Sequence, residues 1–315
     1  MSTLSGKSMS RRTVVKGAVA TGLAAALGRV TAFAADALPM LTRAIPSTGE
    51  QLPVIGIGTN AFDVTAADEL ATRKDVLQNL PLLGGRLVDT ARGYGRSEEV
   101  IGQLVAELGN RKSLFLATKT PMAGDLSNPQ AVVDESFKRL RTDYIDLMEI
   151  HNFYGTEELM PVLKEYKQAK KLRYIGATTS FEPQYPQLLE VMRKHPLDFI
   201  QVNFSIDARL SAKEILPLAK EKGIAVLINM PLGGRRGSFR PKLADKPLPA
   251  WAAEIDATSW AQLMLKYNLS QPGVTAVIPG TTIMAHLQDN QRAGRGRLPD
   301  AAMRKRIEDL WASFG

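Results

Sequence analysis

From residue 53 onwards, short apolar runs alternate with longer segments in which apolar residues recur every three or four positions. The apolar runs are nearly continuous, as in parallel strands that are buried on both faces of a sheet. The longer segments have the spacing of amphipathic helices. In residues 157–170, for example, Leu159, Leu163 and Tyr166 fall on one stripe, with lysines and glutamates opposite. The chain is therefore expected to alternate between strands and helices.

Eight strands are predicted, with a helical segment between each strand and the next. The strands are expected at residues 53–58, 86–91, 114–119, 144–151, 174–178, 199–204, 225–230 and 276–280. The helices are expected at residues 66–83, 97–108, 129–140, 157–170, 183–194, 212–222 and 258–267, with a closing helix over residues 301–313. Eight such units predict an α/β fold, a closed (β/α)8 TIM barrel, which typically takes about 250 residues.

Two extended runs before the barrel flank the turn-forming sequence STGE at residues 47–50, which predicts an N-terminal β-hairpin. The alternative fold is a doubly wound open sheet. That fold carries a G-x-G-x-x-G sequence after its first strand, whereas GIG at residues 56–58 is followed by TNA. We therefore expect residues 35–315 to form a single barrel domain.

The N-terminus has the order of an export signal. Paired arginines, Arg11 and Arg12, precede an uncharged run at residues 17–28, and the small-residue pattern AFA follows at residues 32–34. The apolar run is too short to span a bilayer, which takes about 20 residues. The pattern resembles a twin-arginine signal. We expect residues 1–34 to be a signal peptide that the twin-arginine export machinery recognises, cleaved near Ala34, and the mature protein to be periplasmic or otherwise exported. The alternative is an amphipathic or disordered tail.

Charge and composition exclude several classes of function. The net charge is +8, but residues 1–34 hold five basic residues and no acid, which leaves +3 for residues 35–315. This balance does not support a nucleic-acid partner, and no stable membrane insertion is expected. The chain has no cysteine, and its three histidines are far apart, so no metal site is predicted.

Four polar residues follow or end consecutive predicted strands. Asp89 ends the second strand and Tyr94 lies in the loop after it, while Lys119 ends the third strand and His151 the fourth. Active sites of TIM barrels lie at these carboxyl ends, so the four side chains are expected to converge. Each residue alone has a structural explanation, such as loop packing or a satisfied core histidine. Their occurrence together favours a catalytic site.

These four residue types suit proton donation to a carbonyl oxygen. A free Tyr has a pKa of about 10, and a nearby ammonium from Lys119 is expected to lower it. Asp89 would pair with Lys119, and His151 would orient the carbonyl by a hydrogen bond. None of the four is a redox agent, so a hydride must come from a cofactor.

The sequences DTARGYGRSEEVIG, ATKT, YIDLMEIHN, YIGATTS, FIQVNFS and AVIPGTTIMAHLQDN occur in the order and at the approximate spacing of an aldo-keto reductase. The resemblance covers roughly residues 40–315. It implies an NAD(P)H-dependent carbonyl reductase or alcohol dehydrogenase that acts on a small carbonyl substrate. In that family Tyr94 would be the general acid, Lys119 and Asp89 would tune it, and His151 would orient the substrate.

The resemblance also implies a set of residues that bind the nicotinamide cofactor. The family's carboxamide contacts fall on two threonines, and its glutamine of the sixth strand is matched by a glutamine. Its stacking aromatic falls on an asparagine, and its basic pair for the 2′-phosphate falls on a glycine and a histidine. The implied cofactor is NADPH, with NADH as the alternative because that basic pair is missing. The implied contacts are Thr178, Thr179, Gln201, Asn229, Leu232, Gly233, Gly280, Thr281, His286, Asp289 and Asn290.

Two other functions remain open at this point. One is a nicotinamide-binding barrel of low turnover that serves as a redox-sensing or partner-binding subunit. The other is a barrel hydrolase that uses carboxylates, although this would leave Lys119 unexplained. We expect a monomer.

Overall fold

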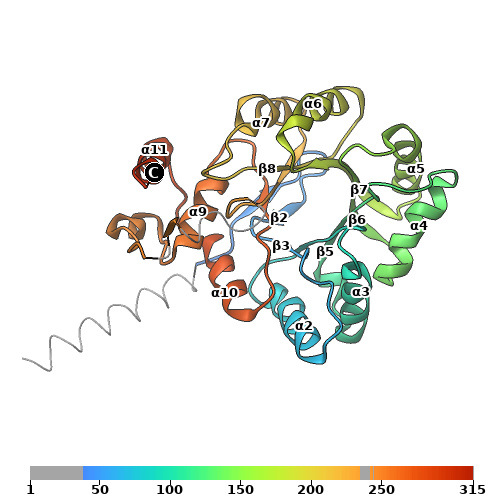
Figure 1. Cartoon of the computed structure of the whole chain (residues 1–315), viewed down its shortest axis with the longest axis horizontal. Coiled ribbons are helices and arrows are strands. Elements are labelled where there is room, and N and C mark those ends of the chain that lie inside the picture. The colour runs from blue at the N-terminus through green and yellow to red at the C-terminus, as the bar shows by residue number, and fades with distance from the viewer. Residues whose placement is uncertain (1–37, 235–241, 244, 315) are drawn as a thin grey trace, which may run out of the picture. The chain divides into compact units, whose positions relative to one another are not determined.

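The computed structural model describes residues 38–234, 242–243 and 245–314. The predicted export signal lies outside these residues. Eight parallel strands form one sheet in the order of the sequence, and helices cover its outer face (Figure 1). In the described part of the chain, no helix is long and apolar enough to cross a membrane.

Strands and helices alternate as the hydrophobic pattern predicted. The strands of the barrel are β3 (Ile57–Gly58), β4 (Leu87–Asp89), β5 (Phe115–Lys119), β6 (Ile145–His151), β7 (Leu172–Thr179), β8 (Phe199–Asn203), β9 (Ala225–Asn229) and β10 (Ala276–Val277). The helices are α2 (Ala67–Leu82), α3 (Ser97–Leu108), α4 (Pro129–Leu140), α5 (Thr156–Gln168), α6 (Tyr185–Lys194), α7 (Ser211–Glu221), α9 (Trp260–Leu269), α10 (Met284–Ala293) and α11 (Ala301–Ala312). The helix α10 and the short 3-10 helices η1 (Arg111–Ser113), η2 (Glu182–Gln184) and η3 (Ala250–Ile255) were not predicted.

The first and last strands of the sheet meet. Parallel bridges join Ile55 to Val277 and Gly58 to Gly280. A β-carbon added at Gly58 would lie 3.0 Å from the carbonyl oxygen of Ile278, so glycine allows this close approach. The predicted TIM barrel is confirmed.

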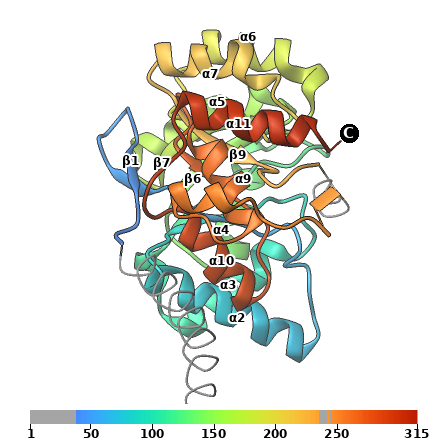
Figure 2. The same ribbon diagram turned by 90° about the vertical axis from the view of Figure 1, so that its left-hand side faces the viewer.

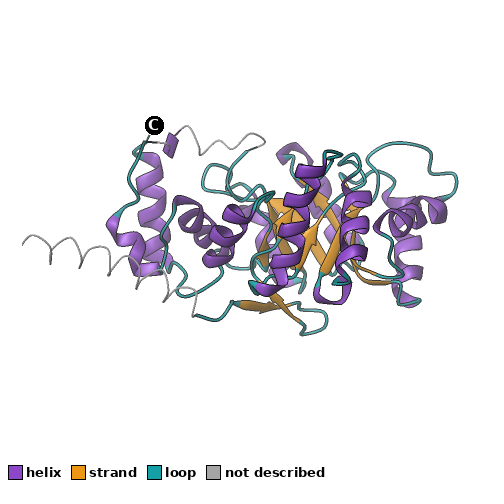
Figure 3. Ribbon diagram, turned by 90° about the horizontal axis from the view of Figure 1, so that it is seen from below, coloured by secondary structure: helices purple, strands orange, loops and turns teal. Residues whose placement is uncertain are grey.

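A two-stranded antiparallel hairpin, β1 (Thr42–Ala44) and β2 (Gln51–Pro53), precedes the barrel, as predicted. Figure 3 shows it beneath the barrel strands. The prediction of one strand over residues 53–58 is wrong, because Pro53 ends β2 and β3 begins at Ile57. Proline has no amide hydrogen with which to continue a ladder.

The inward-facing side chains of the strands form layers, because successive residues of a strand point to opposite faces. The lower layers are apolar, and the hairpin contributes Ile45 and Leu52 to them. The strands contribute Leu87, Phe115, Ala117, Leu147, Tyr174, Phe199, Ala225, Leu227, Ala276 and Ile278. Two residues further along four of these strands, the same face carries the buried polar residues Asp89, Lys119, Glu149 and Gln201. The change from apolar to polar layers defines the end of the barrel that can perform chemistry.

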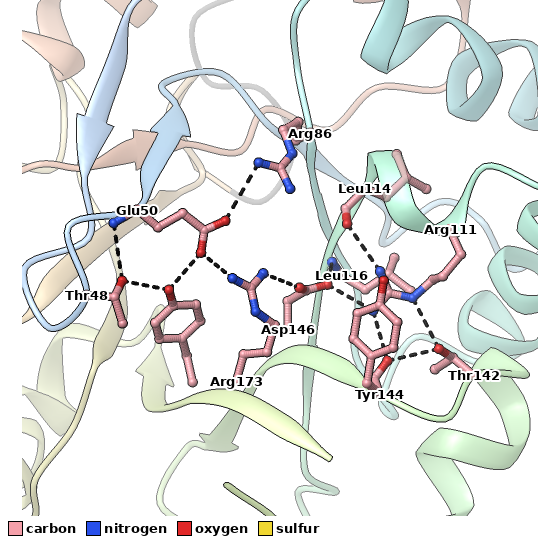
Figure 4. A network of polar contacts seen from close by, with 11 residues as sticks. Thr48, Glu50, Arg86, Arg111, Leu114, Leu116, Thr142, Tyr144, Asp146 and Arg173 are labelled. Carbon is pink, nitrogen blue, oxygen red and sulfur yellow. Dashed lines mark hydrogen bonds and ion pairs between the residues drawn. The ribbon is translucent and has the colours of Figure 1, made fainter. Parts of the chain in front are cut away.

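An ion-pair network links the hairpin to the end of the barrel that lies opposite the polar layer (Figure 4). Asp146 of β6 is buried and accepts hydrogen bonds from Arg111, Arg173 and the Leu116 amide at 2.7–2.9 Å. Arg173 also pairs with Glu50 of the hairpin turn. The network satisfies a buried carboxylate and fixes the hairpin under the barrel.

The C-terminal helix α11 packs on the outside of the barrel across α9 (Figure 2). Tyr267 of α9 donates a hydrogen bond to Glu308 of α11 at 2.7 Å, and Ile307 is fully buried. The helix therefore covers an apolar surface on the outside of the barrel.

Candidate active site

The four residues expected to form the site lie together. Asp89, Lys119 and His151 are the last residues of the neighbouring strands β4, β5 and β6. The Lys119 ammonium donates to both carboxylate oxygens of Asp89, at 2.8 and 2.7 Å. Lys119 Nζ also lies 5.3 Å from the centre of the Tyr94 ring, and that ring meets the His151 ring edge-on at 6.5 Å between centroids.

The loop after β4 fixes the position of Tyr94. The Tyr94 amide donates to the Ala91 carbonyl, and Gly95 follows with a φ of +59°. A β-carbon at Gly95 would lie 2.2 Å from Asp63, whose carboxylate accepts a hydrogen bond from the Arg96 amide. The positive φ and the close contact both require glycine. Helix α3 then begins at once, so Tyr94 is presented from a short, rigid turn.

Lys119 and Asp89 form a buried ion pair. Burial alone lowers the pKa of Lys119, but the negative charge of Asp89, followed by Tyr94 and Glu149, raises it more, so the net direction is upward. Burial raises the pKa of Asp89, and the positive charge of Lys119, followed by the hydrogen bonds from Lys119 and Gln201, offsets part of this effect. Lys119 thus remains a cation next to the phenol.

The expectation that Tyr94 would have a lowered pKa is wrong. The Lys119 ammonium does lower the pKa of Tyr94, but burial and the charges of Asp89 and Glu149 outweigh it and raise the pKa above its ordinary value. The sum includes a second buried acid, Glu149, besides the cation Lys119 and the acid Asp89.

His151 is a neutral imidazole at physiological pH. Burial, followed by the positive charge of Lys119, lowers its pKa to about 3. Its backbone amide donates to the Thr120 hydroxyl at 3.2 Å, and its buried Nδ1 has no protein partner among the described residues. A neutral imidazole can donate one hydrogen bond without giving up a proton, which suits the orienting role.

A cleft of about 770 Å³ opens above the four residues. Asp89, Tyr94, Lys119 and His151 line it together with residues of α9 and α10. The volume lies within the usual range for ligand pockets. Nine of the eleven predicted cofactor residues also line the cleft: Thr178, Gln201, Asn229, Leu232, Gly233, Gly280, His286, Asp289 and Asn290.

The other two predicted cofactor residues do not line the cleft, and their hydroxyls are bonded inside the protein. Thr179 is fully buried and donates to Gln184 at 2.6 Å. Thr281 donates to the Pro279 carbonyl and accepts from Asn290. The hydroxyl group that lines the cleft near Thr178 belongs to Ser180 instead.

Leu232 and Gly233, two of the predicted cofactor contacts, lie in the turn after β9. The Gly233 amide donates to the Met230 carbonyl at 3.0 Å, so this amide closes the turn. The position of Gly233 remains compatible with a close approach of ligand, because its φ is +93° and it has no side chain.

A chain of side-chain amides forms the floor of the cleft. Asn229 Nδ2 donates to Gln201 Oε1 at 3.2 Å, and Gln201 Nε2 donates to Asp89 Oδ1 at 2.7 Å. These two bonds fix which way the Gln201 amide points. The buried Asn229 Oδ1 has no protein partner among the described residues, so the floor has a free acceptor for a ligand.

Sequence reasoning overlooked several residues of the site. Glu149 is fully buried beside Asp89 and Lys119, and Trp260 and Met264 line the cleft. The signal for Glu149 was present in the sequence DLMEIH, where it occupies an inward-facing position two residues before His151. Trp260 and Met264 lie in a helix, and nothing in their spacing distinguished them from core residues.

The family of this chain follows from its sequence. The model of the aldo/keto reductase family matches residues 54–312. The chain belongs to the aldo/keto reductase family. This family assignment covers the whole barrel and supports carbonyl reduction in general.

The sequence identity between this chain and individual members of the aldo/keto reductase family is low. The chain is 34% identical to Aldo-keto reductase YhdN of Bacillus subtilis (strain 168) over 203 residues, which cover 58% of this chain and 60% of that protein. It is 27% identical to Aldo-keto reductase yakc [NADP(+)] of Schizosaccharomyces pombe over 303 residues, covering 81% and 88%. Among solved structures, the thermostable aldo-keto reductase Tm1743 in complex with the inhibitor epalrestat is 26% identical, with a TM-score of 0.69, covering 86% of this chain and 100% of that one.

Proposed function

We propose that this aldo/keto reductase uses NADPH to reduce small aldehydes or ketones to alcohols. The observation that carries the proposal is the convergence of Asp89, Tyr94, Lys119 and His151 at one end of the cleft. A relative whose name specifies NADP(+) supports the choice of cofactor.

The residues of the cleft fit a nicotinamide cofactor. The free Asn229 Oδ1 can accept a hydrogen bond from a carboxamide N–H, and Thr178 and Gln201 lie on the same floor. At the far end, Gly280, Asp289 and Asn290 would hold the adenosine part. One oxygen of Asp289 accepts a hydrogen bond from Ser259, the N-cap of α9, and the other accepts one from Gln262 of α9, so this residue is held in place.

When bound, NADPH supplies the hydride that adds to the carbonyl carbon. His151, as a neutral donor, holds the carbonyl oxygen. Tyr94 gives its phenolic proton to that oxygen, so the carbonyl gains a hydride and a proton and becomes an alcohol. Lys119 stabilises the phenolate that remains, and Asp89 holds Lys119 and balances its buried charge.

The choice between NADPH and NADH depends on the 2′-phosphate end of the cleft. Gly280 has no side chain and His286 is exposed there, so the described residues provide no strong cation at these two positions. Fluorescence titration of the purified protein with NADPH and NADH tests binding and preference together. Tighter binding of NADPH supports the proposal, and binding of neither cofactor contradicts it. Binding without reduction of any aldehyde in a broad panel would favour the low-turnover alternative.

We also propose that the protein is exported by the twin-arginine route. Arg11 and Arg12, followed by an uncharged run and an A-x-A pattern, support this proposal. Replacement of both arginines by lysine keeps the charge and should leave the protein in the cytoplasm, as fractionation and immunoblotting would show. Unchanged export of the double variant would contradict the twin-arginine interpretation.

A further inference from the structure

Glu149 is a buried acid to which the proposed reaction gives no role. It lies on β6 directly opposite Lys119 of β5 in the strand register, and its side chain is 0% exposed. It faces inward, two residues before His151. Gly176 on the next strand leaves room for it, because a β-carbon there would lie 3.1 Å from Glu149 Cγ. The fold therefore accommodates an acid beneath the active site.

One amide links Glu149 to the catalytic residues. Gln201 Nε2 donates to Glu149 Oε2 at 3.0 Å and to Asp89 Oδ1 at 2.7 Å. The second carboxyl oxygen, Glu149 Oε1, has no hydrogen-bond partner among the described residues. A buried carboxylate with one shared hydrogen bond is poorly stabilised as an anion.

The charges around Glu149 do not balance if it is ionised. Asp89 from β4, Lys119 from β5 and Gln201 from β8 face it, and Tyr94 and His151 lie at the same end of the barrel. Lys119 is the only cation among them, and Asp89 already binds it through both oxygens. Burial and repulsion from Asp89 raise the pKa of Glu149 well above its ordinary value, although attraction to Lys119 lowers it. The single shared hydrogen bond, the unpartnered Oε1 and the lack of a second cation among the described residues thus favour the neutral acid over the carboxylate at Glu149.

We propose that Glu149 releases its carboxyl proton when NADP+ binds and retains it when NADPH binds. This inference rests on the proposed function. The nicotinamide ring of NADP+ carries a positive charge, and the dihydronicotinamide ring of NADPH is neutral. A ring that donates hydride to a carbonyl held by Tyr94 and His151 would be held by residues of the same cleft, among them Gln201 and Asn229. The NADP+ ring would be a second cation besides Lys119. Its positive charge would balance the negative charge of Glu149, the second carboxylate besides Asp89.

The step is a simple ionisation. The carboxyl O–H bond of Glu149 breaks, the electron pair stays on the carboxylate, and the proton goes to the solvent buffer. No bond of NADP+ changes. By linkage, the affinity for NADP+ rises with pH by up to about tenfold per pH unit while Glu149 titrates, and the affinity for NADPH does not follow. The ionised Glu149 thus stabilises bound NADP+, the form of the cofactor that remains after hydride donation. Its role is to place a negative charge and not to react.

Isothermal titration calorimetry in two buffers of different ionisation enthalpy counts the protons released. At pH 7.5, binding of NADP+ to the wild-type protein should release up to one proton more than binding of NADPH. The two cofactors carry the same 2′-phosphate, so protons from that group cancel in the comparison. In the isosteric variant Glu149→Gln, the difference should vanish. In the control Tyr94→Phe, it should persist, because the phenol is not its source.

The outcomes separate the two proposals. Failure of the wild-type protein to bind either cofactor contradicts the proposed function. Binding with equal proton release for NADP+ and NADPH overturns the role of Glu149, and so does a difference that persists in Glu149→Gln. If Glu149→Gln does not fold, the Tyr94→Phe control still decides, because loss of the difference there would assign the proton to Tyr94 instead.

Discussion

Lys119 and Asp89 form a buried two-pronged ion pair, with both carboxylate oxygens within 2.8 Å of the ammonium and both side chains at most 3% exposed. Each of the two residues ends a strand, and the strands are adjacent in the sheet. The pair therefore places a fixed positive charge beside Tyr94. We therefore expect both the stability of the barrel and the activity of the site to depend on this ion pair.

Removal of Lys119 alone should destabilise the fold, because Asp89 would remain as an uncompensated buried charge. We expect Lys119→Met to lower the free energy of unfolding by about 3 kcal/mol, measured by chemical denaturation. The double variant Asp89→Asn, Lys119→Met leaves no charge behind and should regain part of this loss. Equal destabilisation of the single and double variants would show that the buried charge is not the cause.

Protonation of His151 should weaken the fold in acid. Its pKa is lowered from 6.5 to about 3 in the folded state, so the folded protein binds fewer protons than the unfolded chain between these values. Its stabilising contribution is therefore complete above pH 6.5 and is lost as the pH falls. Between pH 7.5 and pH 5, the wild-type protein should lose about 2 kcal/mol more than His151→Gln, which cannot be protonated. Parallel denaturation curves for the two proteins at both pH values would contradict this prediction.

Asp146 should be the most sensitive residue of the network at the hairpin end of the barrel. Asp146→Ala leaves Arg111, Arg173 and the Leu116 amide without their acceptor and should cost about 3 kcal/mol of stability in a denaturant titration. As a control, Lys305→Ala removes an exposed ion pair with Asp309 and should change stability by less than about 0.5 kcal/mol. Comparable losses in the two variants would mean that burial of the network contributes little.

Much of the fold was predictable because strand burial and helix periodicity leave clear patterns. The residues at the ends of β4, β5 and β6 could be found for the same reason, since a barrel brings adjacent strand ends together. The direction of the Tyr94 pKa could not be predicted, because it depends on the sum of burial and three charges, and one of these, Glu149, looked like part of an apolar strand. The side-chain orientations of Thr179 and Thr281 could not be predicted from the sequence either. Each hydroxyl could face the cleft or donate to a nearby protein acceptor, and the sequence does not distinguish the two.

The short strands at the barrel seam show a second limit. Residues 53–58 and 276–280 looked like full strands, but β3 and β10 each have two residues. The apolar composition of a segment indicates that it is buried. The length of a strand depends instead on which backbone N–H and C=O groups form hydrogen bonds where the first and last strands of the barrel meet. Isolated bridges replace a regular ladder there.

We propose that Tyr94 donates the proton in carbonyl reduction. The direct test is the variant Tyr94→Phe, which removes one oxygen atom, compared with Tyr166→Phe in the outer helix α5 as a matched control. Steady-state reduction of an aldehyde and fluorescence titration with NADPH should be measured for both variants. We predict that Tyr94→Phe binds NADPH like the wild-type protein and loses about 10²- to 10⁴-fold in kcat, while Tyr166→Phe keeps both properties. Turnover by Tyr94→Phe close to that of the wild-type protein would contradict the mechanism.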